Sequence, residues 1–246
     1  MRLDPAAAAS GVRLLSFDNV GSTNSEALMR GRAGDAGPLW VTAQTQDAGR
    51  GRRGREWVSQ AGNLFASLLL TEIPEPARAA ELSFVAALAV RDAVTALAPS
   101  LAPRLKWPND VLLDGAKFCG ILVEGEGGSN ARFGVAIGIG VNCRSHPRET
   151  SHPATDLAAA GADLTVQDVF ARLSITMLSR LKQWDRGAGF AAIRADWLAH
   201  ATGLGGDIRI RLPDRELAGR FTGIDVRGHL VLALPDGTTR PFCIRI

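Results

Sequence analysis

The sequence predicts an α+β fold in which helices cover a mixed sheet, followed by a small all-β unit. Up to about residue 202, apolar runs of strand length alternate with longer segments whose apolar residues recur every three or four positions. From Gly203 the chain changes to short strand-like runs separated by Pro-Asp, Arg-Gly and Asp-Gly turns. We therefore expect one domain over residues 1–202 and a second over residues 203–246.

Three segments in the first third of the chain have the length and apolar content of strands. They are Arg13–Asp18, Leu39–Gln44 and Leu64–Leu70. A turn over Gly21–Asn24 follows the first strand, and the next residues indicate a helix because Thr23 and Glu26 have capping-box spacing. The glycine-rich and arginine-rich segment Asp47–Arg55 indicates a loop.

The rest of the larger domain combines a hairpin, a glycine-rich strand and helices. Apolar spacing predicts helices over Ala77–Ala98, from Thr165 onward and over Phe190–His200. Asp114-Gly115 predicts the turn of a hairpin between two apolar strands, after a short strand over Leu105–Trp107. The run Phe133–Asn142 alternates glycine with apolar residues, which indicates a strand whose backbone another group approaches closely.

Charge and hydropathy exclude several classes of protein. The chain has 28 basic and 25 acidic side chains, and its net charge of +3 is too small to bind polyanions without local clustering. No apolar run reaches the roughly 18 residues that a membrane span needs, and Met1–Ser10 lacks the apolar core of a secretory signal. We expect a soluble, cytoplasmic protein that binds no membrane.

The cysteines and histidines predict neither a disulfide framework nor a zinc site. Cys119, Cys143 and Cys243 are far apart and form no C-x-x-C pair. The four histidines form no H-E-x-x-H motif and no close pair. We therefore expect no metal site built from a cluster of protein side chains.

The densest feature is the segment Gly49–Arg55, which holds four of the 25 arginines. It formally matches G-x-G-x-x-G, but a dinucleotide site needs a helix after the glycines, and here Glu56-Trp57-Val58 leads to a strand. Two interpretations stay open. The glycine backbone and the guanidinium groups clamp an anion, or the segment is a solvated basic loop.

Lysine is rare in this chain, with 3 lysines against 25 arginines. Two of the three, Lys106 and Lys117, flank the predicted hairpin, and the first begins the string Lys106-Trp107-Pro108-Asn109-Asp110. Because arginine serves most other cationic positions, this placement indicates two sites that require a compact ammonium, unless it arises by chance.

The turn over Gly21–Asn24 offers hydroxyl and amide groups directly after the first strand. Gln46, at the end of the next strand, is expected beside it. These groups form either part of a binding site or only a helix cap.

Four strings, in this order, carry a resemblance to a known family. They are STN (22–24), QDAGRGRRGREW (46–57), LKWPNDVLLDGAKFCGILVEG (105–125) and GIGVN (138–142). Over about residues 13–246 the chain resembles biotin protein ligases, which attach biotin to the carrier domain of biotin-dependent carboxylases. The resemblance implies a class II aminoacyl-tRNA-synthetase-like catalytic domain with a C-terminal SH3-like β-barrel. Only about a dozen residues precede the first strand, so we expect the form without an N-terminal helix-turn-helix domain, and no DNA binding.

The family chemistry that the resemblance implies has two steps. The carboxylate of biotin attacks the α-phosphorus of ATP, with Mg²⁺ as the accompanying ion, and gives biotinyl-5'-AMP and pyrophosphate. The amine of a lysine on the biotin carboxyl carrier protein then attacks this mixed anhydride. No tightly bound cofactor is implied.

The resemblance also assigns site residues, position by position. Catalytic roles fall to Lys117, Arg52 and Asp110, the last as a Mg²⁺ partner or as the base for the incoming lysine. The biotin side comprises Ser22, Thr23, Asn24, Gln46, Arg50, Gly51, Arg52, Lys117 and Gly120. The ATP side comprises Arg52, Arg53, Arg55, Trp57, Lys106, Asn109, Lys117 and Asn142. The arginine loop is expected to order over the adenylate and shield it from water.

Two other functions compete with this one. A lipoate or octanoate protein ligase or transferase would share the fold and the lysine, but the RGRRGR and KWPND strings disfavour it. A non-catalytic nucleic-acid-binding protein would use the Arg/Gly loop as a phosphate track, and would need interleaved aromatic residues and a strongly basic balance. The sequence leaves open whether two copies form a homodimer.

Overall fold

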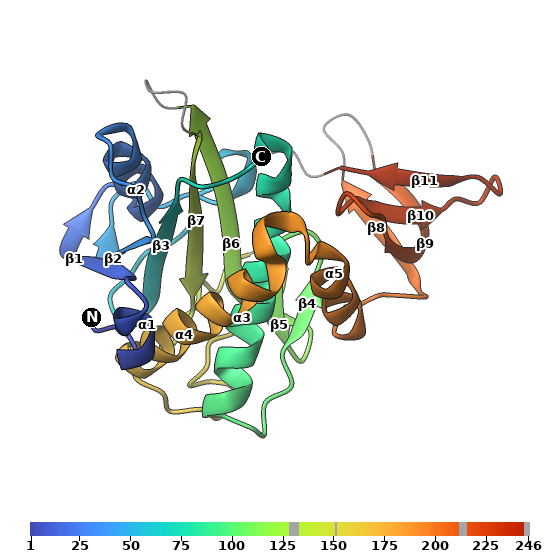
Figure 1. Ribbon diagram of the computed structural model, residues 1–246. Coiled ribbons are helices and arrows are strands. Elements are labelled where there is room, and N and C mark those ends of the chain that lie inside the picture. Colours follow the sequence, from blue (N-terminus) through green and yellow to red (C-terminus); the bar gives the residue numbers. More distant parts are fainter. Residues whose placement is uncertain (128–132, 151, 212–215, 244–246) are drawn as a thin grey trace.

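The protein consists of a seven-stranded sheet, flanking helices and a smaller four-stranded sheet (Figure 1). The computed structural model describes residues 1–127, 133–150, 152–211 and 216–243. In the large sheet the strand order is β1-β2-β3-β7-β6-β5-β4; β1 and β2 are parallel and all other neighbours are antiparallel. The strands are β1 (Arg13–Val20), β2 (Leu39–Gln46), β3 (Leu64–Leu70), β4 (Arg104–Lys106), β5 (Asp110–Leu113), β6 (Ala116–Gly127) and β7 (Phe133–Val141).

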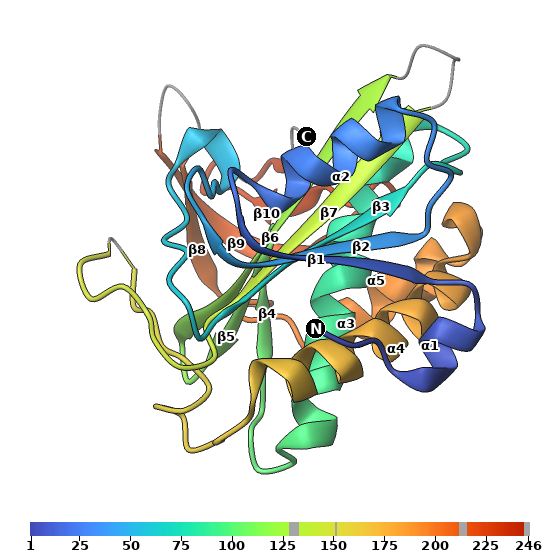
Figure 2. The ribbon, with the colours of Figure 1, turned by 90° about the vertical axis from the view of Figure 1, so that its left-hand side faces the viewer.

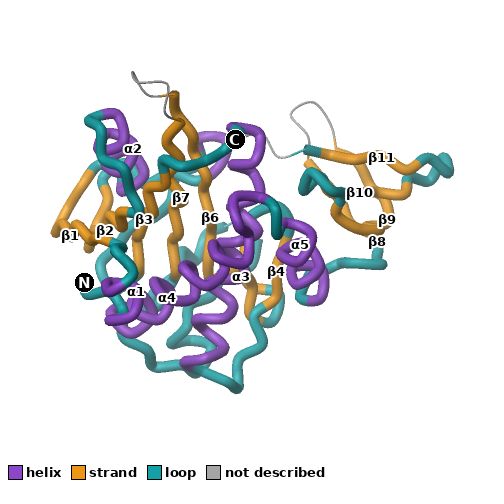
Figure 3. The backbone as a smooth tube through the Cα atoms, viewed as in Figure 1, coloured by secondary structure: helices purple, strands orange, loops and turns teal. Residues whose placement is uncertain are grey.

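Helices flank the large sheet on both faces. They are α1 (Pro5–Ala9), α2 (Thr23–Arg32), α3 (Leu82–Leu97), α4 (Val166–Trp184) and α5 (Phe190–Ala199). Figure 2 shows α2 on one side of the sheet and α3, α4 and α5 on the other, and Figure 3 shows this second group in front of the sheet. No helix in the described part of the chain is long and apolar enough to cross a membrane. The α2 side, which one helix covers only in part, is the side that holds the pocket described below.

The central strands have two chemically different faces because side chains alternate along a strand. The side chains that point toward α3, α4 and α5 belong to the main hydrophobic core: Leu64, Ala66, Leu68, Cys119, Ile121, Val123, Ile137, Ile139 and Val141. Alternate positions on β6 and β7 face α2, and these include Gly120, Gly138 and Gly140. The glycines therefore concentrate on one face of the sheet.

Aromatic side chains join helix α3 to helix α5, and helix α4 to the sheet. The ring of Phe84 on α3 meets Phe190 and Trp197 of α5 edge-on, with centroids 5.6 and 5.3 Å apart. Trp40 of β2 meets Phe170 of α4 in the same geometry at 5.6 Å. Edge-to-face packing at such distances stabilises aromatic pairs beyond the burial of their area. These contacts fix α4 and α5 against the elements that they cover.

The C-terminal segment forms the predicted run of short strands. Strands β8 (Asp207–Arg211), β9 (Glu216–Ile224), β10 (Leu230–Ala233) and β11 (Thr239–Phe242) make an antiparallel sheet in the order β11-β10-β9-β8. Phe221, Leu230 and Leu232 pack into the main core, and the guanidinium of Arg194 on α5 donates to the carbonyl of Ile224 at 3.2 Å. The domain boundary between residues 202 and 203 stays a prediction.

Most predicted elements are confirmed with small shifts at their ends. Strand Leu64–Leu70 has the predicted bounds, and the hairpin turns at Asp114 and Gly115 with φ of 46° and 80°. The hydroxyl of Thr165 caps α4 by accepting from the amide of Asp168 at 3.1 Å. The helix predicted from Ala77 begins at Leu82, because the preceding residues Pro76–Glu81 form a 3₁₀ turn.

Two features at helix N-termini differ from the sequence analysis. The capping box of Thr23 and Glu26 is wrong: Ser22 is the N-cap, its side chain makes no capping hydrogen bond, and Thr23 is the first helical residue. The Thr23 hydroxyl instead bonds to Gln46 and Ser67, so tertiary partners replace the local cap. Short helix α1, for which the sequence analysis predicts no element, is capped by Asp4, whose carboxylate accepts from the amide of Ala6.

Replacing Phe84 by alanine should strongly destabilise the fold. Phe84 is 1% exposed and is the residue on which α3, α5 and the turn at Gly228 converge. The loss of a buried aromatic ring and the resulting cavity typically cost about 3–5 kcal/mol. Urea unfolding measures the change; Val226→Ala, at a position 76% exposed, should stay within about 0.5 kcal/mol. Equal effects of the two substitutions would contradict this account of the core.

Candidate active site

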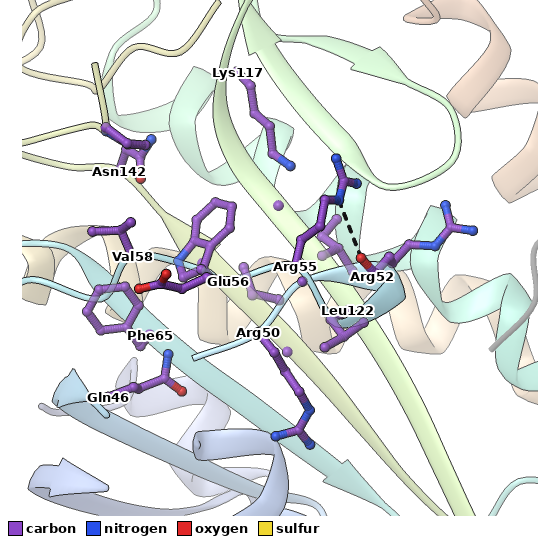
Figure 4. Close-up of a pocket in the computed structure, with 18 of the residues that line it drawn as sticks. Gln46, Arg50, Arg52, Arg55, Glu56, Val58, Phe65, Lys117, Leu122 and Asn142 are labelled. Atoms are coloured by element: carbon purple, nitrogen blue, oxygen red, sulfur yellow. Dashed lines mark hydrogen bonds between the residues drawn. The ribbon is translucent and has the colours of Figure 1, made fainter. Parts of the chain in front are cut away.

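A cavity of about 370 Å³ opens on the α2 side of the sheet (Figure 4). The start of α2, the Arg/Gly loop, strands β3, β6 and β7 and a segment between β7 and α4 line it. Thirteen of the sequence-predicted site residues are in its lining: Ser22, Thr23, Asn24, Gln46, Arg50, Gly51, Arg52, Arg55, Trp57, Asn109, Lys117, Gly120 and Asn142. The structure thus brings together side chains that are more than a hundred residues apart in the sequence. Arg53, Lys106 and Asp110 are not in the lining.

Neutral polar groups meet at one corner of the cavity. The side-chain oxygen of Gln46 accepts from the amide and the hydroxyl of Thr23 at 2.8 and 3.1 Å. The hydroxyl of Ser67, which is fully buried, lies 2.7 Å from the Thr23 hydroxyl and 2.6 Å from Oδ1 of Asn24. Buried neutral groups that satisfy one another in this way avoid the large free-energy cost of a buried charge. We call Thr23, Asn24, Gln46 and Ser67 the polar corner; the predicted proximity of Gln46 to the turn is confirmed.

Arg50 adjoins the polar corner, but its guanidinium is bound by Glu124 and Ser25, two residues that do not line the cavity. It forms a two-pronged ion pair with Glu124, in which Nε and Nη2 each lie 3.0 Å from a carboxylate oxygen. Its Nη1 donates to the hydroxyl of Ser25 at 3.0 Å, and Figure 4 shows the side chain pointing away from Lys117. The guanidinium of Arg50 is therefore already paired with a carboxylate, and its part in an anion clamp stays a prediction.

Glycines form the floor of the cavity and allow close approach from above. A Cβ added at Gly140 would lie 2.6 Å from the indole of Trp57, and one at Gly120 would lie 2.8 Å from the same ring. A Cβ at Gly138 would collide with Oδ1 of Asn24. The close approach predicted for the glycine-rich strand is confirmed. Trp57 and Asn24 occupy the space that the side chain of any residue other than glycine would fill at these three positions.

Cationic groups gather at the end of the cavity opposite Gln46 (Figure 4). Nζ of Lys117 lies 2.5 Å from Oδ1 of Asp110 and 5.2 Å from the centre of the Trp57 ring. The Asp110 oxygen has no hydrogen bond of good geometry, so the contact is electrostatic. The backbone of Lys117 is fixed by its amide, which donates to the carbonyl of Pro153 at 2.8 Å.

The arginines beside Lys117 are held by a tight turn. The amide of Gly51 donates to the carbonyl of Arg55 at 2.6 Å, and Nε of Arg55 donates to the carbonyl of Arg52 at 3.4 Å. Arg53 has φ of 61°, the left-handed conformation that closes the turn. Burial, followed by repulsion from Arg53, lowers the pKa of the Arg52 guanidinium, which still stays charged at neutral pH. Arg52 and Arg55 thus present positive charge to the cavity.

The residues predicted around the ATP side serve partly as supports. Nδ2 of Asn109 donates to the carbonyl of Ile121 at 2.6 Å, and Nδ2 of Asn142 donates to the carbonyl of Thr155 at 3.0 Å. Lys106 ends β4 and pairs with Asp110 in the sheet. These contacts fix the strand ends that surround Lys117.

Several residues of the site are not among those predicted from the sequence. Ser67 and Glu124 complete the polar network, Ser59 joins it to Trp57, and Phe65 and Leu122 supply apolar lining. A wall is contributed by Pro147, Glu149, Thr150, His152 and Ala154. Glu124 had a signal, because it lies four residues after Gly120 on the same strand and therefore on the same face.

The cysteines and carboxylates of the described residues form no cluster of metal ligands. Across residues 1–127, 133–150, 152–211 and 216–243, no three His, Cys, Asp or Glu side chains gather as a metal site. Cys119 and Cys143 are buried thiols, and burial raises the pKa of Cys143 to about 12. Asp110 is a single carboxylate that Lys117 already contacts.

The cavity is suited to a small ligand with a neutral hydrogen-bonding head and an anionic end. The polar corner offers amide and hydroxyl groups, Phe65 and Leu122 offer apolar surface, and Lys117, Arg52 and Arg55 offer positive charge. Such a gradient from neutral to cationic orients a ligand of this kind in one direction.

Comparison with known proteins gives the class and then the family. The profile of the biotin/lipoate A/B protein ligase family matches residues 23–142, and that of the biotin protein ligase C terminal domain matches residues 203–242. The chain is 42% identical over 222 residues to the biotin–[acetyl-CoA-carboxylase] ligase of Paracoccus denitrificans, which covers 88% of this chain and 92% of that one. This chain belongs to the biotin protein ligase family.

Solved structures agree with this assignment. The biotin protein ligase from Aquifex aeolicus in complex with biotin and ATP superposes with a TM-score of 0.77 and 26% identity, over 94% of this chain and 95% of that chain. The biotin protein ligase from Leishmania major in complex with biotinyl-5-AMP gives 0.68 and 25%, over 94% and 99%. The fold observed for this chain is the biotin protein ligase fold.

A methyl group at Gly138 should disturb the polar corner. Gly138→Ala forces Asn24, which is 3% exposed, out of its position over β7, and overpacking of this kind typically costs about 1–3 kcal/mol. Gly134→Ala on the same strand is the matched control, since its nearest contacts would be at 3.9 Å. Unfolding in urea compares the two variants. A Gly138→Ala protein as stable as the control would show that the corner is looser than described.

Proposed function

We propose that this protein is a biotin protein ligase that activates biotin with ATP and transfers it to a lysine of a biotin carboxyl carrier protein. The observation that supports this function best is one cavity that has a neutral polar corner at one end and Lys117, Arg52 and Arg55 at the other. The ureido ring of biotin has donors and an acceptor but no charge, and its carboxylate is anionic. The two ends of biotin therefore match the two ends of the cavity.

In the proposed first step, the carboxylate oxygen of biotin attacks the α-phosphorus of ATP. The bond to the bridging oxygen breaks, and pyrophosphate leaves with its electron pair. The carboxylate is already ionised at neutral pH, so the step needs positioning and charge neutralisation more than a base. Lys117 moves from Asp110 to the anionic oxygens, and Arg52 neutralises charge on the same side.

In the proposed second step, the amine of the carrier lysine attacks the mixed anhydride and AMP leaves. In this proposal Asp110, once Lys117 has turned to the adenylate, takes the proton of the incoming ammonium; its contact with Lys117 supports this role. The remaining predicted residues keep their proposed sides: Ser22, Gly51 and Gly120 on the biotin side, and Arg53, Arg55, Trp57, Lys106, Asn109 and Asn142 on the ATP side. The arginine loop closes over the adenylate and keeps water away from the anhydride.

Mg²⁺ fits this site as an ion that arrives with ATP. Magnesium keeps several waters and is commonly bound through one or two carboxylates and substrate phosphates. As the alternative to its role as the base, Asp110, the carboxylate beside Lys117, would supply the protein ligand. When bound, the ion neutralises charge on the leaving pyrophosphate.

The finer structural assignments belong to the same proposal. We assign the large domain to the class II aminoacyl-tRNA-synthetase-like architecture and the four-stranded sheet to an SH3-like barrel; the mixed topology and the antiparallel order β11-β10-β9-β8 support these assignments. Cytoplasmic location fits an enzyme whose substrates include ATP. Formation of a homodimer stays a prediction.

Ligand-induced stabilisation should distinguish the competing functions. With biotin and Mg-ATP at about 1,000 times the dissociation constant, linkage predicts roughly 4 kcal/mol of added stability. Thermal shift assays should show this increase with biotin and not with lipoate or an oligonucleotide. Stabilisation by lipoate alone would indicate the lipoate or octanoate ligase, and stabilisation by the oligonucleotide alone would indicate a nucleic-acid binder.

Replacing Lys117 by alanine should abolish adenylate formation while the fold survives. The loss of a cation positioned on the transferring group typically lowers the rate by about 100-fold or more. Exchange of labelled pyrophosphate into ATP in the presence of biotin measures this step directly. Lys182→Ala, at an exposed position on α4, is the matched control. Normal exchange in the Lys117→Ala protein would remove Lys117 from the mechanism.

A further inference from the structure

Glu124 is an acidic residue beside the cavity to which neither the sequence analysis nor the proposed mechanism assigns a role. It lies on β6, on the face that carries Gly120 and Leu122, and its side chain is 28% exposed. Its two carboxylate oxygens accept three hydrogen bonds. Two come from Nε and Nη2 of Arg50 at 3.0 Å each, and one comes from Nδ2 of Asn24 at 2.7 Å.

These contacts fix the orientation of the Asn24 amide. Its NH₂ group has two hydrogens, and both are used, one on Glu124 and one on the carbonyl of Leu122 at 3.1 Å. Oδ1 is then left to face Ser67 and the floor at Gly138. If the amide were reversed, Oδ1 would face a carboxylate and a carbonyl, two acceptors without a proton between them. The charge of Glu124 therefore decides which atom Asn24 turns toward the polar corner.

Glu124 also connects the polar corner to the arginine loop. The arginine loop, together with the residues that follow it, runs from Gly49 to Ser59. Its Arg50 is held by the same carboxylate that holds Asn24. At its other end, Nε2 of Gln46 donates to the hydroxyl of Ser59 at 3.0 Å, and this hydroxyl donates to the carbonyl of Trp57 at 2.8 Å. The loop is thus joined to the corner at two points, one of them ionic.

We propose that Glu124 is a positioning residue that orients Asn24 toward the ureido group of biotin and holds Arg50 beside the same corner. The inference rests on the proposed function and adds a residue to it. Glu124 need not touch biotin; it acts through Asn24 and Arg50. A carboxylate is required because two oxygens must accept from three donors, whereas a glutamine would turn an NH₂ group toward Arg50 or Asn24 and leave donors facing each other.

The test compares two matched variants on one strand. Glu124→Gln removes the charge at the proposed position, and Glu126→Gln makes the same change two residues on, where Glu126 pairs with Arg32 at 2.8 Å, outside the cavity lining. The dissociation constants of biotin and of ATP alone are measured by calorimetry for each protein. Glu124→Gln should weaken biotin binding by about tenfold or more, with ATP binding changed by less than about twofold. Glu126→Gln should leave both within about twofold, and Glu124→Asp, which keeps the charge, should recover part of the loss.

Three outcomes would overturn the inference or the function beneath it. Unchanged biotin affinity in Glu124→Gln rules out the positioning role. A parallel loss of biotin affinity, ATP affinity and unfolding midpoint would make Glu124 a merely structural residue, and also rules it out. Failure of the unmodified protein to bind biotin would instead contradict the proposed function.

Discussion

Alternation of side chains along β6 and β7 is the constraint on which the pocket depends. Ile121 and Ile139 point into the core beneath α3, α4 and α5, so Gly120, Gly138 and Gly140 point to the opposite face. A slip of one residue in strand register would exchange the two sets and expose the core residues. The free energy of burying the core therefore fixes the register and places the glycines under the cavity. The same strand register therefore determines both the packing of the core and the geometry of the site.

Above this floor, the neutral polar groups lie at one end of the cavity and the cationic groups at the other. Neutral side chains satisfy one another at the corner around Ser67, while cations collect around Lys117. The negative charge of Glu124 is the exception beside the corner, and the guanidinium of Arg50, which lines the cavity, neutralises it. A ligand that bears one charge at one end meets no unpaired buried charge at the other. The proposed function assigns recognition of biotin and activation of its carboxylate to this one cavity, without a protein nucleophile.

Sequence reasoning succeeded where local chemistry decides the structure. The Asp114-Gly115 turn and the Thr165 cap depend only on nearby residues, and both are confirmed. Sequence reasoning failed where contacts between residues far apart in the sequence determine the structure. Thr23 has the spacing of a cap, but the sheet brings Gln46 and Ser67 within reach of its hydroxyl. Ser67 and Glu124 were not predicted, because the partners of a polar residue in an apolar strand can be identified only after the strand order is known. Thirteen of the sixteen site residues predicted by motif line one cavity, yet the motif did not indicate that Arg50 faces Glu124.

Transfer of biotin to a carrier tests the central claim most directly. The protein is incubated with biotin, ATP, MgCl₂ and a purified biotin carboxyl carrier domain, and the carrier is analysed by mass spectrometry. The account predicts one biotinyl group on a single carrier lysine, formed only when ATP is present. An unmodified carrier, or a carrier modified when lipoate replaces biotin and not by biotin itself, would contradict it.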